Sequence, residues 1–143
     1  MQIRKMLLAD VDRISELEEM IFTMPWHKES FIEMIENPDS VYMVAIEDEK
    51  PVALCGIIDI AGEGNISNVL TDPEYRGRGF GYEVVKAAME ECLKGKTECF
   101  TLEVRVSNTP AISLYEKLGF VSEGVRPNYY EKPTEDALIM WKR

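Results

Sequence analysis

The sequence is poor in two residue types that enzymes use for nucleophilic and metal chemistry. It has one histidine, His27, and three cysteines among 143 residues. A lone histidine excludes catalytic triads that need a second histidine and most metal-ligand clusters, so we expect His27 to lie in a surface loop. Cys55, Cys92 and Cys99 are odd in number, have apolar neighbours and lack a Cys-x-x-Cys spacing, which favours buried free thiols over disulfides or zinc ligands. No metal site is predicted.

Long apolar runs and basic residues are also scarce. No stretch is long enough to cross a bilayer, and Asp10 and Asp12 follow the first residues in place of an extended apolar segment. We therefore expect a cytoplasmic protein without membrane contact. The 16 basic residues stand against 26 acidic ones, for a net charge of -10. Such a field repels nucleic acid, which is not an expected partner, and favours cationic partners, although solubility alone also explains many acidic proteins.

What the chain contains is the pattern of one domain, residues 1–143, of mixed α/β class. Its length suits a single core, and it has no internal repeat, linker or low-complexity segment. Hydrophobic spacing predicts helices over residues 10–21, 31–36, 84–93 and 110–118, and a polar loop over residues 126–136. It predicts strands over residues 2–8, 41–46, 52–61, 66–70, 100–106, 121–125 and 137–141. This order indicates a mixed sheet of about seven strands with helices on both faces.

The most informative motif is Arg76-Gly77-Arg78-Gly79-Phe80-Gly81, between a strand and the start of a helix. Glycines at alternate positions leave main-chain N–H groups unshielded where the helix dipole and the unpaired donors attract phosphate. The motif therefore predicts a site for a phosphorylated cofactor. A glycine-rich turn with two solvated arginines is the simpler alternative.

Two common phosphate-binding motifs do not match this segment. The dinucleotide fingerprint Gly-x-Gly-x-x-Gly would end at Tyr82 or at Val84, and neither is glycine. The complete Walker pattern does not occur in the chain. What remains is Arg-x-x-Gly-x-Gly after a strand that ends in Thr71-Asp72-Pro73. This pattern resembles the acyl-CoA pyrophosphate loop of the GNAT family of N-acetyltransferases.

The resemblance extends along essentially the whole chain and is closest to the RimI-type N-terminal acetyltransferases, which modify the first residue of a ribosomal protein. It implies the GNAT fold, with a mostly antiparallel sheet, and direct transfer from acetyl-CoA to the α-amine of a protein N-terminus, such as that of a basic ribosomal protein. A small amine such as a polyamine or an aminoglycoside, or a non-catalytic CoA-binding module, stays open as an alternative. The expected state is a monomer or a weak homodimer. The stretches that carry the resemblance are Pro25-Trp26, residues 102–105 with Asn108, residues 114–120, Asn128-Tyr129-Tyr130 and Glu135-Asp136-Ala137.

Two residues are candidates for proton transfer. Strand alternation places Glu103 on one face with Thr101 and Arg105, and the resemblance makes Glu103 the general base; a solvent-facing or Arg105-paired carboxylate is the alternative. The resemblance makes Tyr115 the general acid beside the sulfur, and plain core packing is the alternative. A tyrosine pKa near 10 exceeds that of a thiol, near 8.5, so this proton transfer is uphill by about 2 kcal/mol unless the site adjusts either value.

The resemblance also assigns binding residues. It implies that the main chain of Val69, Leu70 and Thr71, at a bulge, meets the acetyl carbonyl and pantetheine, and that Asn108 bonds the pantetheine arm or stabilises its own turn. Glu18, Glu19 and Glu29 either attract a basic peptide or lie on solvated helix faces. The diphosphate loop comprises Arg76, Gly77, Arg78, Gly79, Phe80, Gly81 and Tyr82. The residues that flank the amine entrance, or merely pack at its edge, are Trp26, Tyr129 and Tyr130.

Overall fold

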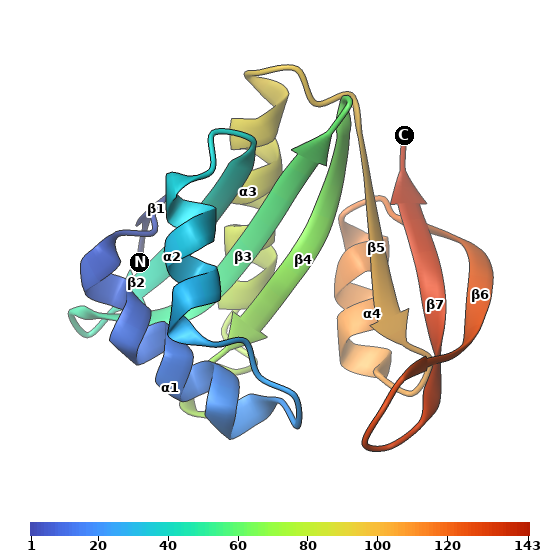
Figure 1. Ribbon diagram of the computed structural model, residues 1–143, viewed down its shortest axis with the longest axis horizontal. Coiled ribbons are helices and arrows are strands. Elements are labelled where there is room, and N and C mark those ends of the chain that lie inside the picture. Colours follow the sequence, from blue (N-terminus) through green and yellow to red (C-terminus); the bar gives the residue numbers. More distant parts are fainter.

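A mixed seven-stranded sheet with four α-helices around it forms the molecule in the computed structural model, which describes all residues 1–143 (Figure 1). The strands lie in the order β1-β2-β3-β4-β5-β7-β6, and every pair is antiparallel except β4 with β5. The predicted fold class, a mostly antiparallel sheet of seven strands, is confirmed. The strands are β1 (Gln2–Lys5), β2 (Ser40–Glu47), β3 (Lys50–Ile60), β4 (Glu63–Thr71), β5 (Cys99–Arg105), β6 (Val121–Tyr130) and β7 (Glu135–Lys142). The helices are α1 (Val11–Ile21), α2 (Lys28–Glu36), α3 (Phe80–Leu93) and α4 (Thr109–Lys117).

The two faces of the sheet bury separate apolar clusters. On one face, Ile14 of α1 and Phe31 of α2 pack with Leu54 and Leu70 of the sheet. On the other face, Val84 of α3 and the residues of α4 pack with the alternate side chains of β2, β3 and β5. Helices on both faces were expected, and the clusters confirm them. None of the helices has the length and apolar composition that a membrane crossing requires.

The sheet is split between β4 and β5. These strands pair only at their first residues, where Glu63 to Asn65 lie beside Cys99 to Thr101. Beyond this point no ladder joins them, and Figure 1 shows the two strands diverging along their length. Beyond Asn65 and Thr101, the facing edges of β4 and β5 are therefore open to a ligand.

A β-bulge in β4 accompanies the split. Gly56 of β3 pairs with Asn68 and Ile57 pairs with Ile66, so Ser67 is the extra residue. An extra residue reverses which face the following side chains occupy. Ile66 accordingly lies in the α3 cluster, whereas Leu70, four residues later, lies in the α1 cluster with α2.

Several element boundaries differ from the prediction. The expected polar loop is shorter, because β6 continues to Tyr130 and only residues 131–134 connect it to β7. Most side chains of β6 are exposed, so pairing with β7 holds this edge strand where hydrophobic alternation gives little signal. The first strand ends at Lys5, since Asp10 accepts the Leu7 N–H at 2.8 Å and turns the chain. The helix α4 begins at Thr109, one residue before the expected start, and Asn108 caps it.

The scarce residues lie as the sequence suggests. Cys55 and Cys92 are buried free thiols and Cys99 is a half-buried one. Burial raises the pKa of the Cys55 thiol far above its usual range, and it raises that of Cys92 to about 11. His27 is an exposed residue directly before α2. The prediction of free thiols and of a surface histidine is confirmed.

Candidate functional site

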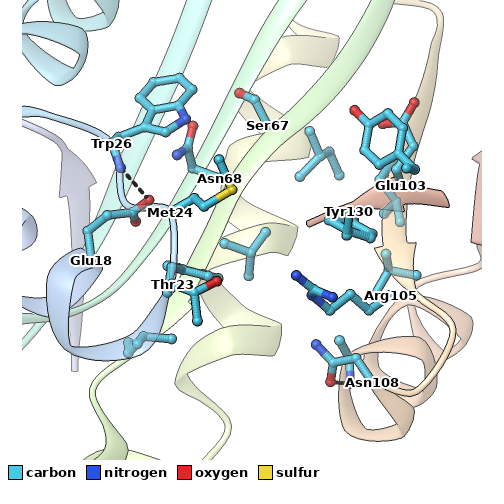
Figure 2. Close-up of a pocket in the computed structure, with 18 of the residues that line it drawn as sticks. Glu18, Thr23, Met24, Trp26, Ser67, Asn68, Glu103, Arg105, Asn108 and Tyr130 are labelled. Atoms are coloured by element: carbon cyan, nitrogen blue, oxygen red, sulfur yellow. Dashed lines mark hydrogen bonds between the residues drawn. The ribbon is translucent and has the colours of Figure 1, made fainter. Parts of the chain in front are cut away.

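The split between β4 and β5 opens into a pocket of about 740 Å³ (Figure 2). Its walls come from the α1–α2 connection, both diverging strands, the start of α4 and the β6–β7 hairpin. Figure 2 shows Glu18, Trp26 and Asn68 on one side, facing Glu103 and Tyr130 on the other. The predicted site residues that line it are Trp26, Val69, Glu103, Asn108, Tyr115, Tyr129 and Tyr130.

Glu103 and Tyr115 reach this pocket from opposite faces of the sheet. The neighbours of Glu103 in β5, Leu102 and Val104, are buried in the α3 cluster, so strand alternation directs Glu103 to the α1 face. Tyr115 belongs to the α3 cluster itself. Only where β4 and β5 separate can groups from both faces meet.

Glu103 is not paired with Arg105. Its Oε1 lies 3.6 Å from Nε of Arg126, and its side chain is 30% exposed. Arg105 instead donates to Oε1 of Glu135 at 3.1 Å and to two carbonyl oxygens of the connecting loop, those of Glu131 and Pro133, both at 2.9 Å. The Glu103 carboxylate therefore remains accessible from the pocket.

The hydroxyl of Tyr115 has no hydrogen-bond partner in the chain, although the residue is 7% exposed. The ring packs edge-on against Phe120 at a centroid distance of 5.9 Å. Burial is the main cause that raises the pKa of Tyr115 far above its usual range. Tyr115 is thus a core residue that also presents an unpartnered O–H to the pocket.

The tyrosine pair at the other end of the pocket is held by arginines. Tyr129 and Tyr130 meet edge to face at 5.0 Å, and the Arg105 guanidinium lies 4.5 Å from the Tyr130 ring centre. Arg126 lies 5.9 Å from the Tyr129 ring. Burial raises the pKa of Tyr130 to about 12, so its hydroxyl is neutral at physiological pH.

Asn108 stabilises its own turn. Its Oδ1 accepts the N–H of Ala111 at 3.3 Å and caps α4. The amide Nδ2 makes no hydrogen bond within the chain, and the residue lines the pocket. Asn108 can therefore stabilise its own turn and still bond the pantetheine arm, because capping uses only the side-chain oxygen.

The glycine loop presents a row of free main-chain donors. No N–H from Arg76 to Tyr82 donates to another group of the chain. Gly77 and Gly79 have φ of 77° and 84°, and a Cβ at either would meet no atom within 4 Å. The left-handed backbone at Gly79 starts α3 at Phe80, four residues before the apolar stripe begins. Free donors at a helix start, beside glycines whose Cβ positions are open, suit an anionic group.

The other members of the predicted loop have different surroundings. Phe80 is buried against Tyr75, at a ring distance of 6.0 Å, so only its main chain faces outward. Arg78 lies 3.5 Å from Glu47 and 5.0 Å from the Tyr75 ring, whereas Arg76 is exposed and forms no ion pair. A Cβ at Gly81 would lie 3.2 Å from Leu114, so this glycine allows close packing of α3 on α4.

Leu70 and Thr71 link the pocket to this loop but do not line the pocket. Leu70 is 3% exposed and belongs to the α1 cluster, and Thr71 is half-buried. The segment that follows is fixed by Asp72, which accepts the Glu74 N–H at 3.0 Å and pairs with Arg13 of α1. This anchorage holds the loop relative to the pocket.

Of the two interpretations offered for Glu18, the solvated helix face is wrong. It is 4% exposed, its Oε1 accepts the Trp26 N–H at 3.2 Å, and burial is the main cause that raises its pKa. Glu19 and Glu29 are exposed, as expected. Glu18 lies four residues after Ile14 and three before Ile21, and this spacing was the available signal that it shares their buried face. The sequence reasoning also missed the pocket residues Ser67 and Asn68.

Comparisons with known proteins agree with this geometry. The family model described as "Acetyltransferase (GNAT) family" matches residues 11–120. A Bacillus subtilis protein provisionally named as a ribosomal protein bS18-alanine N-acetyltransferase is 43% identical over 140 residues, covering 97% of this chain and 93% of the relative. The Escherichia coli (strain K12) enzyme of that name is 31% identical over 138 residues, covering 92% and 90%.

The fold of a solved relative is also the same. The crystal structure of the ribosomal-protein-S18-alanine N-acetyltransferase from Escherichia coli superposes with a TM-score of 0.88 at 28% identity, over 98% of this chain and 91% of that one. The family model covers well over half of the chain, and both named relatives align along nearly all of it. The chain belongs to the acetyltransferase (GNAT) family.

Proposed function

We propose that this protein transfers the acetyl group of acetyl-CoA to the α-amino group of a protein N-terminus, as the names of its relatives state for the bS18-alanine acetyltransferases. The observation that carries the proposal is the convergence of Glu103 and Tyr115, from opposite faces of the sheet, in the one pocket that the β4–β5 split opens. A base and an acid that reach one pocket from opposite faces of the sheet suit a reaction in which one group loses a proton and another gains one.

The residues of the chain fit acetyl-CoA. The free N–H groups from Arg76 to Tyr82 would bind its diphosphate, and no side chain stands at Gly77 or Gly79 to restrict its approach. Val69 and Asn108 line the pocket, and Leu70 and Thr71 connect Val69 to the segment before the loop. The main chain of Val69 and the free Nδ2 of Asn108 would hold the pantetheine arm. Bound there, acetyl-CoA supplies an acetyl thioester to the pocket.

Glu103 and Tyr115 divide the proton transfers between them. A free α-amine has a pKa of about 7.7 to 8.0, so it arrives largely protonated and Glu103 receives its proton. Glu103 passes this first proton on to the solvent. The nitrogen lone pair then forms the new amide C–N bond while the C–S bond breaks, and Glu103 accepts the second proton that the nitrogen loses as it becomes an amide. Tyr115 gives its hydroxyl proton to the departing sulfur and recovers a proton from the solvent. Burial raises the pKa of Tyr115, but the same dry surroundings disfavour a thiolate and raise the pKa of the thiol as well. The pKa of the Tyr115 hydroxyl and the pKa of the CoA thiol thus both rise.

The shape and the rim of the pocket favour a peptide acceptor over a small amine. The α1–α2 connection and the β6–β7 hairpin flank the pocket, with Trp26 on one side and Tyr129 and Tyr130 on the other. The exposed apolar side chains Phe22 and Met24 continue this rim. Aromatic and apolar side chains that line an open pocket can contact several consecutive residues of an extended chain.

Release of free CoA thiol from acetyl-CoA tests the proposal. A panel of short peptides that varies the first two residues should give turnover, and the same peptides with a blocked first amine should give none. Spermidine and an aminoglycoside serve as small-amine acceptors in parallel. Activity on small amines alone would overturn the proposed acceptor class, and acetyl-CoA binding without turnover on any amine would indicate a non-catalytic module.

A further inference from the structure

The pocket wall formed by α1 contains a buried acid with one free oxygen. Glu18 Oε2 is the only buried side-chain nitrogen or oxygen atom of the protein that lacks a hydrogen-bond partner. The other oxygen, Oε1, is occupied by the Trp26 N–H. Burying an unpaired carboxylate oxygen is costly, and native structures rarely retain one without a ligand, a water or a catalytic role to explain it. Glu18 belongs to the wall of the pocket, so Oε2 lies next to the space that a ligand would occupy.

The same wall contains an amide whose donor is free and, unlike Glu18 Oε2, accessible to solvent. The bulge at Ser67 directs Asn68 to the α1 face of β4, where the residue is 7% exposed. Its Oδ1 accepts the Tyr42 hydroxyl at 2.6 Å, and its Nδ2 bonds no group of the chain. Asn68 also lines the pocket, and Figure 2 shows it beside Trp26 on the side of Glu18.

Neighbouring contacts fix the orientation of both groups. The Tyr42 ring occupies space that a Cβ at Gly56 would fill, since the two would be 2.2 Å apart, and its hydroxyl is 3.2 Å from Ser67 Oγ. Trp26 packs on Tyr42 at a ring-centroid distance of 6.5 Å. Trp26, whose N–H bonds Glu18, therefore also supports Tyr42, whose hydroxyl bonds Asn68. An acceptor and a donor are therefore held on one wall before any ligand arrives.

This pair complements a peptide group, which carries one N–H donor and one C=O acceptor. A polyamine would satisfy Glu18 but would leave the Asn68 donor unpaired, because it has no carbonyl. We propose that Glu18 and Asn68 form a subsite for the main chain of the acceptor, in which Glu18 Oε2 accepts the N–H of the first peptide bond and Asn68 Nδ2 donates to a main-chain carbonyl. This inference rests on the proposed function and adds the reason that the acceptor is a peptide.

A structural role for Glu18 makes a different prediction. If its task were only to accept the Trp26 N–H, glutamine would serve equally well, because its side-chain oxygen can make the same bond. Glu18→Gln replaces the second acceptor by a donor at nearly constant shape. Glu19→Gln, on the exposed side of the same helix, is the matched control for the change in charge.

The test compares a peptide with its ester analogue, in which oxygen replaces the first peptide N–H. The wild-type protein should use the ester with a kcat/KM about tenfold lower. Glu18→Gln should lose about tenfold on the amide peptide, mainly through KM, and should no longer distinguish amide from ester. Glu19→Gln should behave as the wild type. The amide-to-ester ratio is compared among variants because the ester changes the pKa of the acceptor amine equally in all of them.

A binding measurement on the wild-type protein needs no variant. Calorimetry in the presence of CoA should show the amide peptide binding about tenfold more tightly than the ester. An equal amide-to-ester ratio in the wild type and in Glu18→Gln, or equal affinities for the two peptides, would overturn the subsite while leaving the acetyltransferase proposal intact. Absence of turnover on every peptide by the wild type would instead overturn the proposed function.

Discussion

The two sides of the pocket satisfy their polar groups in opposite ways. On the side of β5 and the β6–β7 hairpin, Arg105 bonds Glu135 and two loop carbonyls, and Glu135 accepts the Ser107 N–H at 2.8 Å. On the side of α1 and β4, Glu18 Oε2 and Asn68 Nδ2 have no partner in the chain. The bonds of Arg105 and Glu135 are complete within the chain, whereas Glu18 and Asn68 offer hydrogen bonds that a ligand can make.

Burial makes this difference informative. The Arg105 and Glu135 side chains are 26% and 17% exposed, and such pairs near the surface contribute at most about 1 kcal/mol to stability. An unsatisfied buried group costs about 1 to 3 kcal/mol. The side of β5 and the β6–β7 hairpin, here called the paired side, is therefore explained by the fold. On the side of α1 and β4, the unpaired side, the missing hydrogen bonds lower the stability of the free protein. A protein can retain a group that costs this much where binding of the acceptor peptide offsets the cost.

The largest effect is expected at Glu103, which lies on the paired side yet keeps its carboxylate available. Glu103→Gln should lower kcat by about a hundredfold or more, because a positioned base contributes that much. Without the base the rate should follow the population of free amine, so the pH optimum should move upward toward the amine pKa of about 7.7 to 8.0. Steady-state rates measured between pH 6 and about pH 10 would show both changes.

Glu116→Gln controls for the loss of one charge near the site, because Glu116 follows Tyr115 in α4 and is exposed. It should leave the rate and the pH profile unchanged. Glu103→Gln should also leave the affinity for acetyl-CoA nearly unaltered, since the glycine loop is unaffected. A variant with full turnover and the wild-type pH profile would show that Glu103 is not the base.

A smaller loss is expected at Tyr115, whose hydroxyl is the free group at the back of the pocket. Tyr115→Phe should lower kcat by roughly tenfold to a hundredfold and leave both KM values near those of the wild type. Its melting temperature should not fall, because the hydroxyl makes no bond within the chain. Tyr75→Phe is the matched control: it removes a hydroxyl outside the pocket that donates to Asp48 at 2.6 Å, and it should lower the melting temperature but not kcat. A destabilised Tyr115→Phe with full kcat would indicate a packing role alone.

The fold could be predicted from the sequence because its signals are local. Apolar spacing of three and four residues marked α1 and α3, and β-branched runs between turn residues marked the strands. The glycine motif marked the turn before α3, although the apolar stripe placed the start of that helix four residues too late. Edge strand β6 was underestimated, because it is held by pairing rather than by burial and its exposed side chains carry no pattern.

The site could be predicted only in part. Family motifs indicated Glu103, Tyr115 and the glycine loop, and the first two line one pocket. The bulge at Ser67 reverses the face of Asn68, and nothing in the local sequence signals that reversal. The side chain of Arg105 lies on the expected face of β5. Its partner, Glu135, is 30 residues away in the sequence, and strand alternation cannot identify such a partner. The groups left unpaired in the pocket could be recognised only when every other hydrogen bond was known.

A change on the paired side should affect stability more than chemistry. Arg105→Met removes the bonds to Glu135 and to the carbonyls of Glu131 and Pro133, and it should lower the free energy of unfolding by about 1 to 2 kcal/mol. Arg126→Met is the control: its side chain is 57% exposed, lies 3.6 Å from Glu103 and 5.9 Å from the Tyr129 ring, and makes no closer bond, so its loss should cost less than about 0.5 kcal/mol. Urea unfolding of both variants measures these values. Equal stability of the two would show that the hairpin does not depend on the Arg105 bonds.

The smallest effect should be a gain in stability at Glu18. Burial raises its pKa in the folded protein above the ordinary value near 4.3, so the folded state holds this proton more strongly than the unfolded state. The stability of the wild type therefore decreases as pH rises from the unfolded pKa to the folded pKa, and the full penalty is present above the latter. Glu18→Gln has no such proton. It should match the wild type near pH 4 and exceed it by about 1 kcal/mol at pH 7.

Urea unfolding of the wild type, Glu18→Gln and Glu19→Gln across this pH range separates the two sides of the pocket. Glu19 is exposed, so its variant should show a small difference that does not grow with pH. A stability gain in Glu18→Gln together with weaker peptide binding would mean that the carboxylate is retained for its ligand and not for the fold. A variant less stable than the wild type at pH 7 would instead place Glu18 with Arg105 and Glu135, among the groups that hold the structure together.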